Sequence, residues 1–92
     1  MRALTWDDFA DAAGSAYPVA VGEVQLELTL DKAEQIASAG RSGAFRLEFL
    51  GPSNPVLPQA TYPFRLADEV IDIFIVPVGN DRNGTRYEAI FS

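Results

Sequence analysis

Acidic side chains are the main candidates for catalytic or metal-binding chemistry in this sequence, because it contains no histidine and no cysteine. Without histidine the chain lacks the commonest general base and the usual zinc ligand, and without cysteine it lacks a thiolate nucleophile. A pair of carboxylates facing each other across a cleft, about 5 to 9.5 Å apart, could still hydrolyse a glycoside. The sequence offers many such pairs and singles out none. We therefore expect the protein not to be an enzyme.

Asp72 is the most unusual of the acids, because an isoleucine flanks it on each side within an otherwise apolar segment. A carboxylate in such a place must be solvated, paired with a cation or protonated. We expect Asp72 to face water or to pair with an arginine such as Arg86 or Arg46. The competing hypothesis is a carboxylate-dependent hydrolase, whose activity would be lost in Asp72→Asn or Glu88→Gln without loss of the fold.

Several patterns resemble metal or cofactor sites but have simpler structural explanations. Asp7, Asp8 and Asp11 could hold a divalent cation, yet acids in the first turn of a helix are expected from the helix dipole alone. Residues 79–84 (GNDRNG) resemble part of a calcium loop, but the spacing puts isoleucine where the bidentate acid belongs. The glycines never form GxGxxG or GxxxxGK[ST]. We expect no cofactor and no metal site.

The charge of the chain excludes one class of partner. Seven basic and thirteen acidic residues give a formal net charge of -6, which repels nucleic acid and anionic membranes. No stretch approaches the ~18 apolar residues of a membrane-spanning helix, and we recognise no signal peptide. The absence of cysteine is consistent with the cytoplasm, which is the location that we expect.

Alternating apolar and polar residues predict strands that each bury one face. The alternating segments are 24–31, 45–50, 61–66 and 85–91, and a weaker strand is expected over 17–21. A further segment, 70–78 (VIDIFIVPV), is apolar on both sides except at Asp72, which predicts a core strand that is either central in the sheet or covered on both faces. The turn-rich residues after it predict a hairpin with a connection of roughly four to six residues. The fold class is therefore mainly β, a small antiparallel barrel or sandwich of about six strands.

The remaining segments complete a single β domain over residues 1–92. Trp6, Phe9, Ala10 and Ala13 share one face of a short N-terminal helix over about 5–13. Residues 32–43 fit either a helix or a strand. Three prolines in residues 51–60 forbid a central strand and predict an ordered loop.

Aromatic side chains at the strand positions are expected to fill the core rather than to form a stacking platform for bases, which would need basic residues between them. These side chains are Phe45, Phe49, Tyr62, Phe64, Phe74, Tyr87 and Phe91.

Three stretches carry a recurring combination of motifs. They are a proline loop with LPQ and a tyrosine (GPSNPVLPQATY, 51–62), a Phe-x-Val-Pro strand (VIDIFIVPVG, 70–79) and a closing Tyr-Glu-Ala segment (RYEAIF, 86–91). Together they resemble a family of short bacterial proteins catalogued only as a domain of unknown function, over roughly residues 4–92. Ala60 stands where that pattern has glycine. The resemblance implies a compact β domain and a setting akin to phage-tail-like or secretion-linked assemblies, and it implies no catalytic residues.

These observations favour a non-catalytic structural or protein-interaction module that binds a protein partner or another copy of itself. The proline loop is expected to expose Leu57, Pro58 and Gln59, and we take these residues, with Arg82, as the candidate partner-binding residues. The alternative hypothesis is a small-molecule-binding β-barrel, in which the aromatic side chains line a cavity instead of filling a core.

Overall fold

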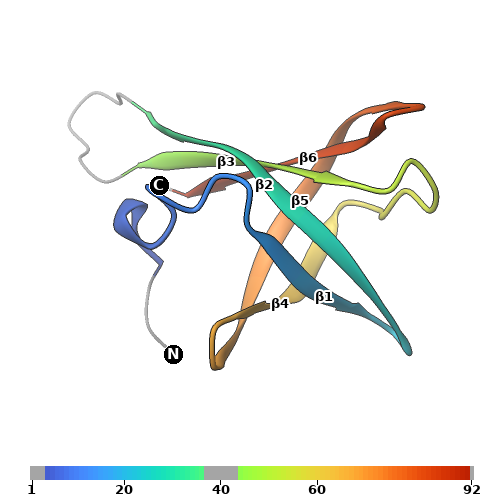
Figure 1. The fold of residues 1–92 in the computed structure, drawn as a ribbon, viewed down its shortest axis with the longest axis horizontal. Helices are drawn as coiled ribbons and strands as arrows, with labels where there is room; N and C mark the ends of the chain where they lie inside the picture. The colour runs from blue at the N-terminus through green and yellow to red at the C-terminus, as the bar shows by residue number, and fades with distance from the viewer. Residues whose placement is uncertain (1–3, 37–43, 92) are drawn as a thin grey trace.

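Antiparallel strands form a closed barrel in the computed structural model, which describes residues 4–36 and 44–91 (Figure 1). The strands are β1 (Ala16–Val21), β2 (Val24–Gln35), β3 (Phe45–Gly51), β4 (Ala60–Leu66), β5 (Glu69–Asp81) and β6 (Gly84–Phe91). Around the barrel they follow the order β1-β2-β3-β6-β5-β4. The prediction of a mainly β, antiparallel fold of about six strands is confirmed, and the structure is the barrel rather than the sandwich.

The barrel closes where β1 meets β4, and this seam is short. Its register is given by Val19 opposite Phe64, whereas β4 and β5 pair along the whole of β4. Pro18 and Pro63 lie next to the seam pair, and proline has no N–H to donate to a ladder. The sequence therefore limits how many hydrogen bonds can close the barrel.

The core fills the inside of the barrel, as the period-two pattern predicts. Each strand points alternate side chains inward, and the fully buried ones include Val19, Leu28, Leu30, Phe45, Leu47, Phe49, Phe64, Ile73, Ile75 and Tyr87. Aromatic rings contact one another there, with centroids of Phe49 and Phe64 5.1 Å apart. The aromatic residues thus pack as a core, with Phe74 as the exposed exception.

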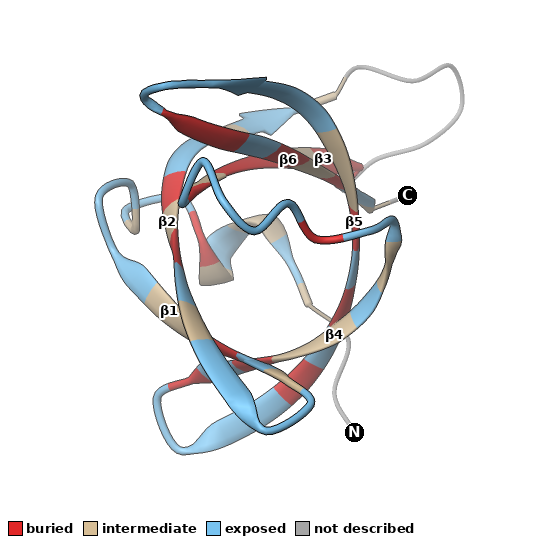
Figure 2. Ribbon diagram, turned by 90° about the vertical axis from the view of Figure 1, so that its right-hand side faces the viewer, coloured by how far each residue is buried: buried red, intermediate tan, exposed pale blue. Residues whose placement is uncertain are grey.

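Two side chains from outside the strands cover the ends of the barrel. Phe9 from the N-terminal segment is fully buried at one end, where its ring lies 6.1 Å from that of Phe45. At the other end the loop from β3 to β4 crosses the opening, and Leu57 in that loop is buried (Figure 2). Leu57 donates its backbone N–H to the hydroxyl oxygen of Tyr87 at 2.8 Å. The prediction that Leu57 is exposed is wrong, because its side chain plugs the barrel.

The N-terminal helix is much shorter than predicted. Of the predicted span 5–13, only Trp6–Asp8 are helical, as a 3-10 turn, and the carboxylate of Asp8 accepts a hydrogen bond from the N–H of Thr5 at 2.8 Å. After Phe9 the chain turns so that Gly14 can donate to the carbonyl of Leu30 in β2 at 2.7 Å. A helix of about nine residues has little stability of its own, so docking Phe9 and joining β2 decide the conformation. The prediction of a helix over 5–13 is therefore wrong.

The structure also settles two segments between the predicted strands, one that the sequence left open and one whose predicted length is wrong. The open choice at 32–43 is a strand as far as Gln35, because β2 continues to that residue, while 37–43 lie outside the described residues. The β5–β6 connection is shorter than four to six residues. Asp81 still pairs with Gly84, so that Arg82 and Asn83 alone make the turn, and Asp81 accepts a hydrogen bond from the N–H of Asn83 at 2.8 Å.

Candidate partner-binding surface

The outer face of β5 is apolar and uncovered. Its inward positions, Ile71, Ile73 and Ile75, are buried as predicted, but the outward Val70, Phe74 and Val78 are 57 %, 51 % and 53 % exposed. Of the two alternatives for this core strand, the central position is found, because β5 lies between β6 and β4. Cover on both faces is wrong, because a closed barrel of one sheet buries only its inside, and the described residues form no second layer over β5. We call these three outward residues the apolar stripe.

The stripe is long enough to receive an extended segment or one side of a helix, and a register shift between Pro77 and Gly79 marks its Val78 end. Its members are four residues apart, so they are about 13 Å apart along the strand and about 27 Å from end to end. Ile90 of β6 is 61 % exposed and lies two residues beyond Glu88, the partner of Val76 of β5, so it adds to the same side of the barrel. Large apolar side chains gathered on one face mark interaction sites more often than scattered ones do.

Asp72 lies within the stripe, between Val70 and Phe74 on the outer face. It is exposed, so the expectation that it faces water is confirmed. Its cross-strand neighbour is Pro63 of β4, and no ion pair joins it to any residue within 4–36 or 44–91. The expected pairing with Arg86 or Arg46 does not occur, because other acids hold both arginines.

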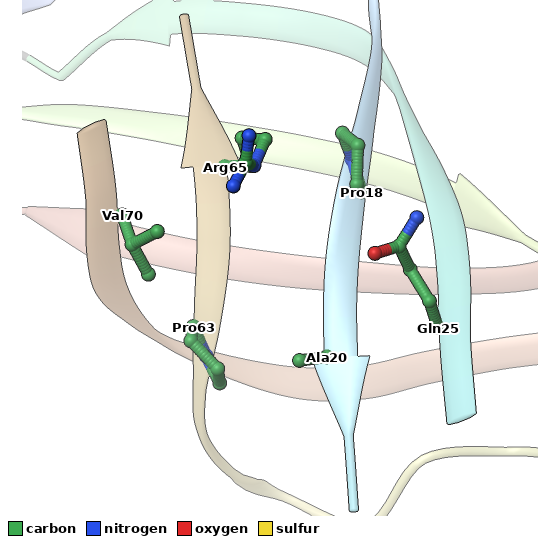
Figure 3. A pocket seen from close by; sticks show the side chains of 6 residues that line it. All are labelled: Pro18, Ala20, Gln25, Pro63, Arg65 and Val70. Carbon is green, nitrogen blue, oxygen red and sulfur yellow. The ribbon is translucent and has the colours of Figure 1, made fainter. Parts of the chain in front are cut away.

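A shallow hollow adjoins the stripe at the barrel seam (Figure 3). It holds about 140 Å³ and is lined by Pro18, Ala20, Gln25, Pro63, Arg65 and Val70. Val70 belongs to both features, and Arg65 is its cross-strand partner. Arg65 forms no ion pair with another described residue. The hollow arises where the β1–β4 pairing is short.

The predicted partner-binding residues lie in three different places. Pro58 and Gln59 are exposed and lead directly into Ala60, which pairs with Ile75, so they lie beside the stripe. Leu57 is in the core and presents no surface. Arg82 is exposed at the tip of the β5–β6 hairpin, four residues and therefore about 13 Å beyond Val78. Pro58 and Gln59 thus lie near the middle of β5, and Arg82 lies beyond the Val78 end of the stripe.

The neighbouring outer face, over β2, β3 and β6, has a different character, because an ion-pair network covers it. Arg46 contacts Glu34, Glu48 and Glu88, and Arg86 contacts Asp31 and Glu48. Glu48 is the centre of the network, with one carboxylate oxygen 2.8 Å from each arginine. Its side chain is largely buried by its neighbours.

The network makes these carboxylates poor candidates for acid catalysis. Hydrogen bonding from Arg46 lowers the pKa of Glu48, burial opposes this effect, and hydrogen bonding from Arg86 adds to it. Glu48 and Glu88 are cross-strand partners, but both contact Arg46 on the outer, convex surface of the barrel. Asp72 lies elsewhere, about 13 Å along β5 from the partner of Glu88. The arrangement favours the ionised form of Glu48 and places the carboxylates of the network on a convex surface instead of across a cleft.

The lowered pKa of Glu48 predicts a loss of stability in acid. Because the folded form binds its proton less readily than the unfolded chain, the stabilisation is present above the ordinary glutamate pKa and is lost as the pH falls through the folded value. Between about pH 5 and pH 3 the free energy of unfolding of the wild type should therefore fall more steeply than that of Glu48→Gln. Urea unfolding at several pH values measures both slopes, and parallel slopes would contradict the assignment.

The described residues show neither a metal-binding group nor a membrane helix. Within 4–36 and 44–91 no three acidic side chains are placed to share a metal ion. In the same residues no helix has the length and apolar character that a bilayer crossing requires.

Comparison with known proteins assigns the chain to a family. The model of the family described as Domain of unknown function (DUF6916) matches residues 4–91, which include every strand of the barrel. The chain belongs to this family. The family's description states no activity, and neither the curated proteins nor the solved structures yielded a match to the chain. The site must therefore be interpreted from its own geometry.

The stripe was missed by sequence reasoning although its signal was visible. Val70, Phe74 and Val78 occupy every second outward position of a strand whose inward positions are also apolar. That pattern indicates cover on both faces, and a chain of this length has strands for one closed layer only. The apolar outer face of β5 could thus be predicted from the sequence. Sequence reasoning treated this face as part of the core, and so did not expect it to be exposed.

Proposed function

We propose that the protein is a non-catalytic protein-interaction module that binds a protein partner through the apolar stripe on β5. The observation that carries the proposal is the exposure of Val70, Phe74 and Val78 on a strand whose sequence is that of a doubly covered one. Three large apolar side chains in water do not stabilise the folded chain. A partner that covers them removes apolar surface from water, which contributes favourable free energy to binding. Pro58 and Gln59 extend the surface at one edge.

The rest of the molecule supports a binding role over a catalytic one. The barrel interior is filled by side chains that contact one another, and the acids of the ion-pair network are held by arginines. The resemblance to a bacterial family of unknown function, whose setting is akin to that of phage-tail-like proteins, extends the proposal to a component of a larger bacterial or phage-tail-like assembly. We expect it to work in the cytoplasm, and this part rests on the sequence alone.

The proposal is tested by comparing two exposed apolar residues, one on the stripe and one off it. Phe74→Ser removes the centre of the stripe, and Val24→Ser removes a side chain that is 60 % exposed at the start of β2. Tagged wild type and both variants are expressed at native abundance, cross-linked and analysed by quantitative mass spectrometry. We expect partners of the wild type to be lost by more than about tenfold with Phe74→Ser and retained with Val24→Ser.

The same samples give the contrary result clearly. Equal recovery with Phe74→Ser and wild type would show that the stripe is not the binding surface. A wild-type protein that is monomeric by light scattering and retrieves no partner would contradict the interaction role altogether.

A further inference from the structure

We infer that the partner segment bound by the apolar stripe is a short chain that combines apolar residues with at least one lysine or arginine, placed opposite Asp72. The inference rests on the proposed function and adds the chemistry of the partner. Its basis is the position of one carboxylate inside an otherwise apolar surface.

Asp72 cannot stay solvated if the stripe is covered. It lies on the outer face between Val70 and Phe74, so a partner that contacts both valine and phenylalanine also removes water from the carboxylate. Removing water from a carboxylate is costly unless a cation or several hydrogen-bond donors replace it. Asp72 has no ion pair within the described residues, so none of them supplies the charge, and we assign it to the partner.

Arg65 is the nearest alternative source of positive charge, and its geometry does not favour it. Arg65 is opposite Val70, whereas Asp72 is opposite Pro63, so the two charged residues are diagonal neighbours about 7 to 8 Å apart at the backbone. The Arg65 side chain lines the hollow instead of contacting the acid. The other arginines described on the outer strands, Arg46 and Arg86, are held by acids of the ion-pair network.

A second copy of this chain fits the surface poorly. In a symmetric dimer both subunits use the same patch, so the interface would bury two Asp72 carboxylates with no added cation. Each copy also carries a formal charge of -6, which opposes association of like chains and favours a basic partner.

The size of the stripe favours a short segment over the face of a folded domain. Half-exposed Val70, Phe74 and Val78 with Ile90 offer on the order of 400 Å² of apolar surface, about half of the ~800 Å² per partner of a typical stable pair. The length of the stripe corresponds to an extended segment of about eight residues. A peptide of about eight residues that combines apolar side chains with a basic residue opposite Asp72 matches both measures.

The test uses the intact protein and a displayed library of random peptides about twelve residues long, enough to span the stripe. Enriched peptides are synthesised, and their dissociation constants are measured by fluorescence anisotropy at low and high salt. We expect the enriched peptides to combine apolar residues with lysine or arginine, and to bind less tightly as the salt concentration rises.

Three variants separate this inference from the proposed function, each checked for an unchanged melting temperature. Asp72→Asn should weaken the peptide by about three- to tenfold and reduce its salt dependence. Arg65→Gln should leave binding unchanged or make it tighter, because it removes a like charge from the basic peptide. Phe74→Ser should weaken binding by more than about tenfold.

Specific results would overturn the inference. Acidic or uncharged peptides, equal affinity for wild type and Asp72→Asn, or weaker binding to Arg65→Gln would show that the partner's cation is not what the surface requires, even if Phe74→Ser abolishes binding and the proposed function stands. Peptides unaffected by Phe74→Ser, or no enriched peptide at all, would overturn both. Sedimentation that shows a dimer broken by Phe74→Ser would make a second copy the occupant and overturn the basic-segment inference.

Discussion

Replacing Phe64 with alanine is expected to lower the free energy of unfolding by about 3–5 kcal/mol, whereas the same replacement at Phe74 is expected to cost less than about 1 kcal/mol. Phe64 of β4 is fully buried, belongs to the seam pair with Val19 and contacts the ring of Phe49. Its removal leaves a cavity in the core and loosens the shortest strand pairing. Phe74 of β5 is half exposed and leaves no cavity.

Urea unfolding followed by circular dichroism measures both changes, with the dependence on urea concentration showing whether the unfolded states remain comparable. Phe64 lies on the inner face of the sheet and Phe74 on its outer face. The difference between the two losses of unfolding free energy therefore shows whether the outer face is covered in the free protein. A loss at Phe74 as large as that at Phe64 would mean that something covers β5 in the free protein. Such a result would contradict the description of the stripe as uncovered.

Replacing Gly84 with alanine is expected to cost about 2–4 kcal/mol, the second-largest effect of a single substitution that we predict. Gly84 begins β6 with φ of +142°, a backbone conformation that residues with a side chain rarely adopt. An added Cβ would also lie 2.5 Å from the carbonyl oxygen of Gly51. The contact is with backbone, so a side-chain rotation cannot relieve it. The consequence reaches the loop over the barrel end, because Thr85 next to Gly84 donates a hydrogen bond to the carbonyl of Pro52 at 2.8 Å.

Gly79→Ala is the matched control for Gly84→Ala. Gly79 lies in the same hairpin, has no positive φ, and an added Cβ would meet no atom within 4 Å. We expect its melting temperature to stay close to that of the wild type, while Gly84→Ala melts about 10–20 °C lower. Equal melting temperatures for the two variants would contradict the close approach of β6 to the end of β3.

Sequence reasoning succeeded where burial on one face alone decides the structure. Leu28 and Leu30 in β2, and Phe45, Leu47 and Phe49 in β3, alternate with polar residues and point into the barrel. Because a strand shifted by one residue would turn its apolar side chains to solvent, such segments specify both their type and their orientation. The barrel follows from several of these segments joined by short connections.

Sequence reasoning failed where contacts with residues distant in the sequence override the local pattern. The spacing of Trp6 and Phe9 is helical, but the burial of Phe9 in the barrel end and the bond from Gly14 to Leu30 fix a different path. Leu57 sits among prolines in a loop, and only the barrel opening that the loop crosses explains why it points inward. Neither outcome can be found from periodicity, because the deciding neighbours are distant in sequence.

The candidate surface is an intermediate case. The apolar character of residues 70–78 is evident from the sequence, and the segment was predicted to be a core strand. What the sequence could not supply is the direction from which cover comes, since the same pattern fits a second layer of the chain or a separate partner. Closure of the barrel leaves Val70, Phe74 and Val78 without cover from the described residues, and a separate partner is the cover that we propose.

Thiol labelling tests the uncovered stripe most directly, because the chain has no cysteine and each single-cysteine variant carries one reactive group. The rate of labelling of Phe74→Cys is compared with that of Val24→Cys at the exposed start of β2 and of Val19→Cys in the core. We predict that the free protein labels at position 74 nearly as fast as at position 24 and far faster than at position 19. Labelling at position 74 as slow as at position 19, in a protein that remains folded, would contradict an open binding face on β5.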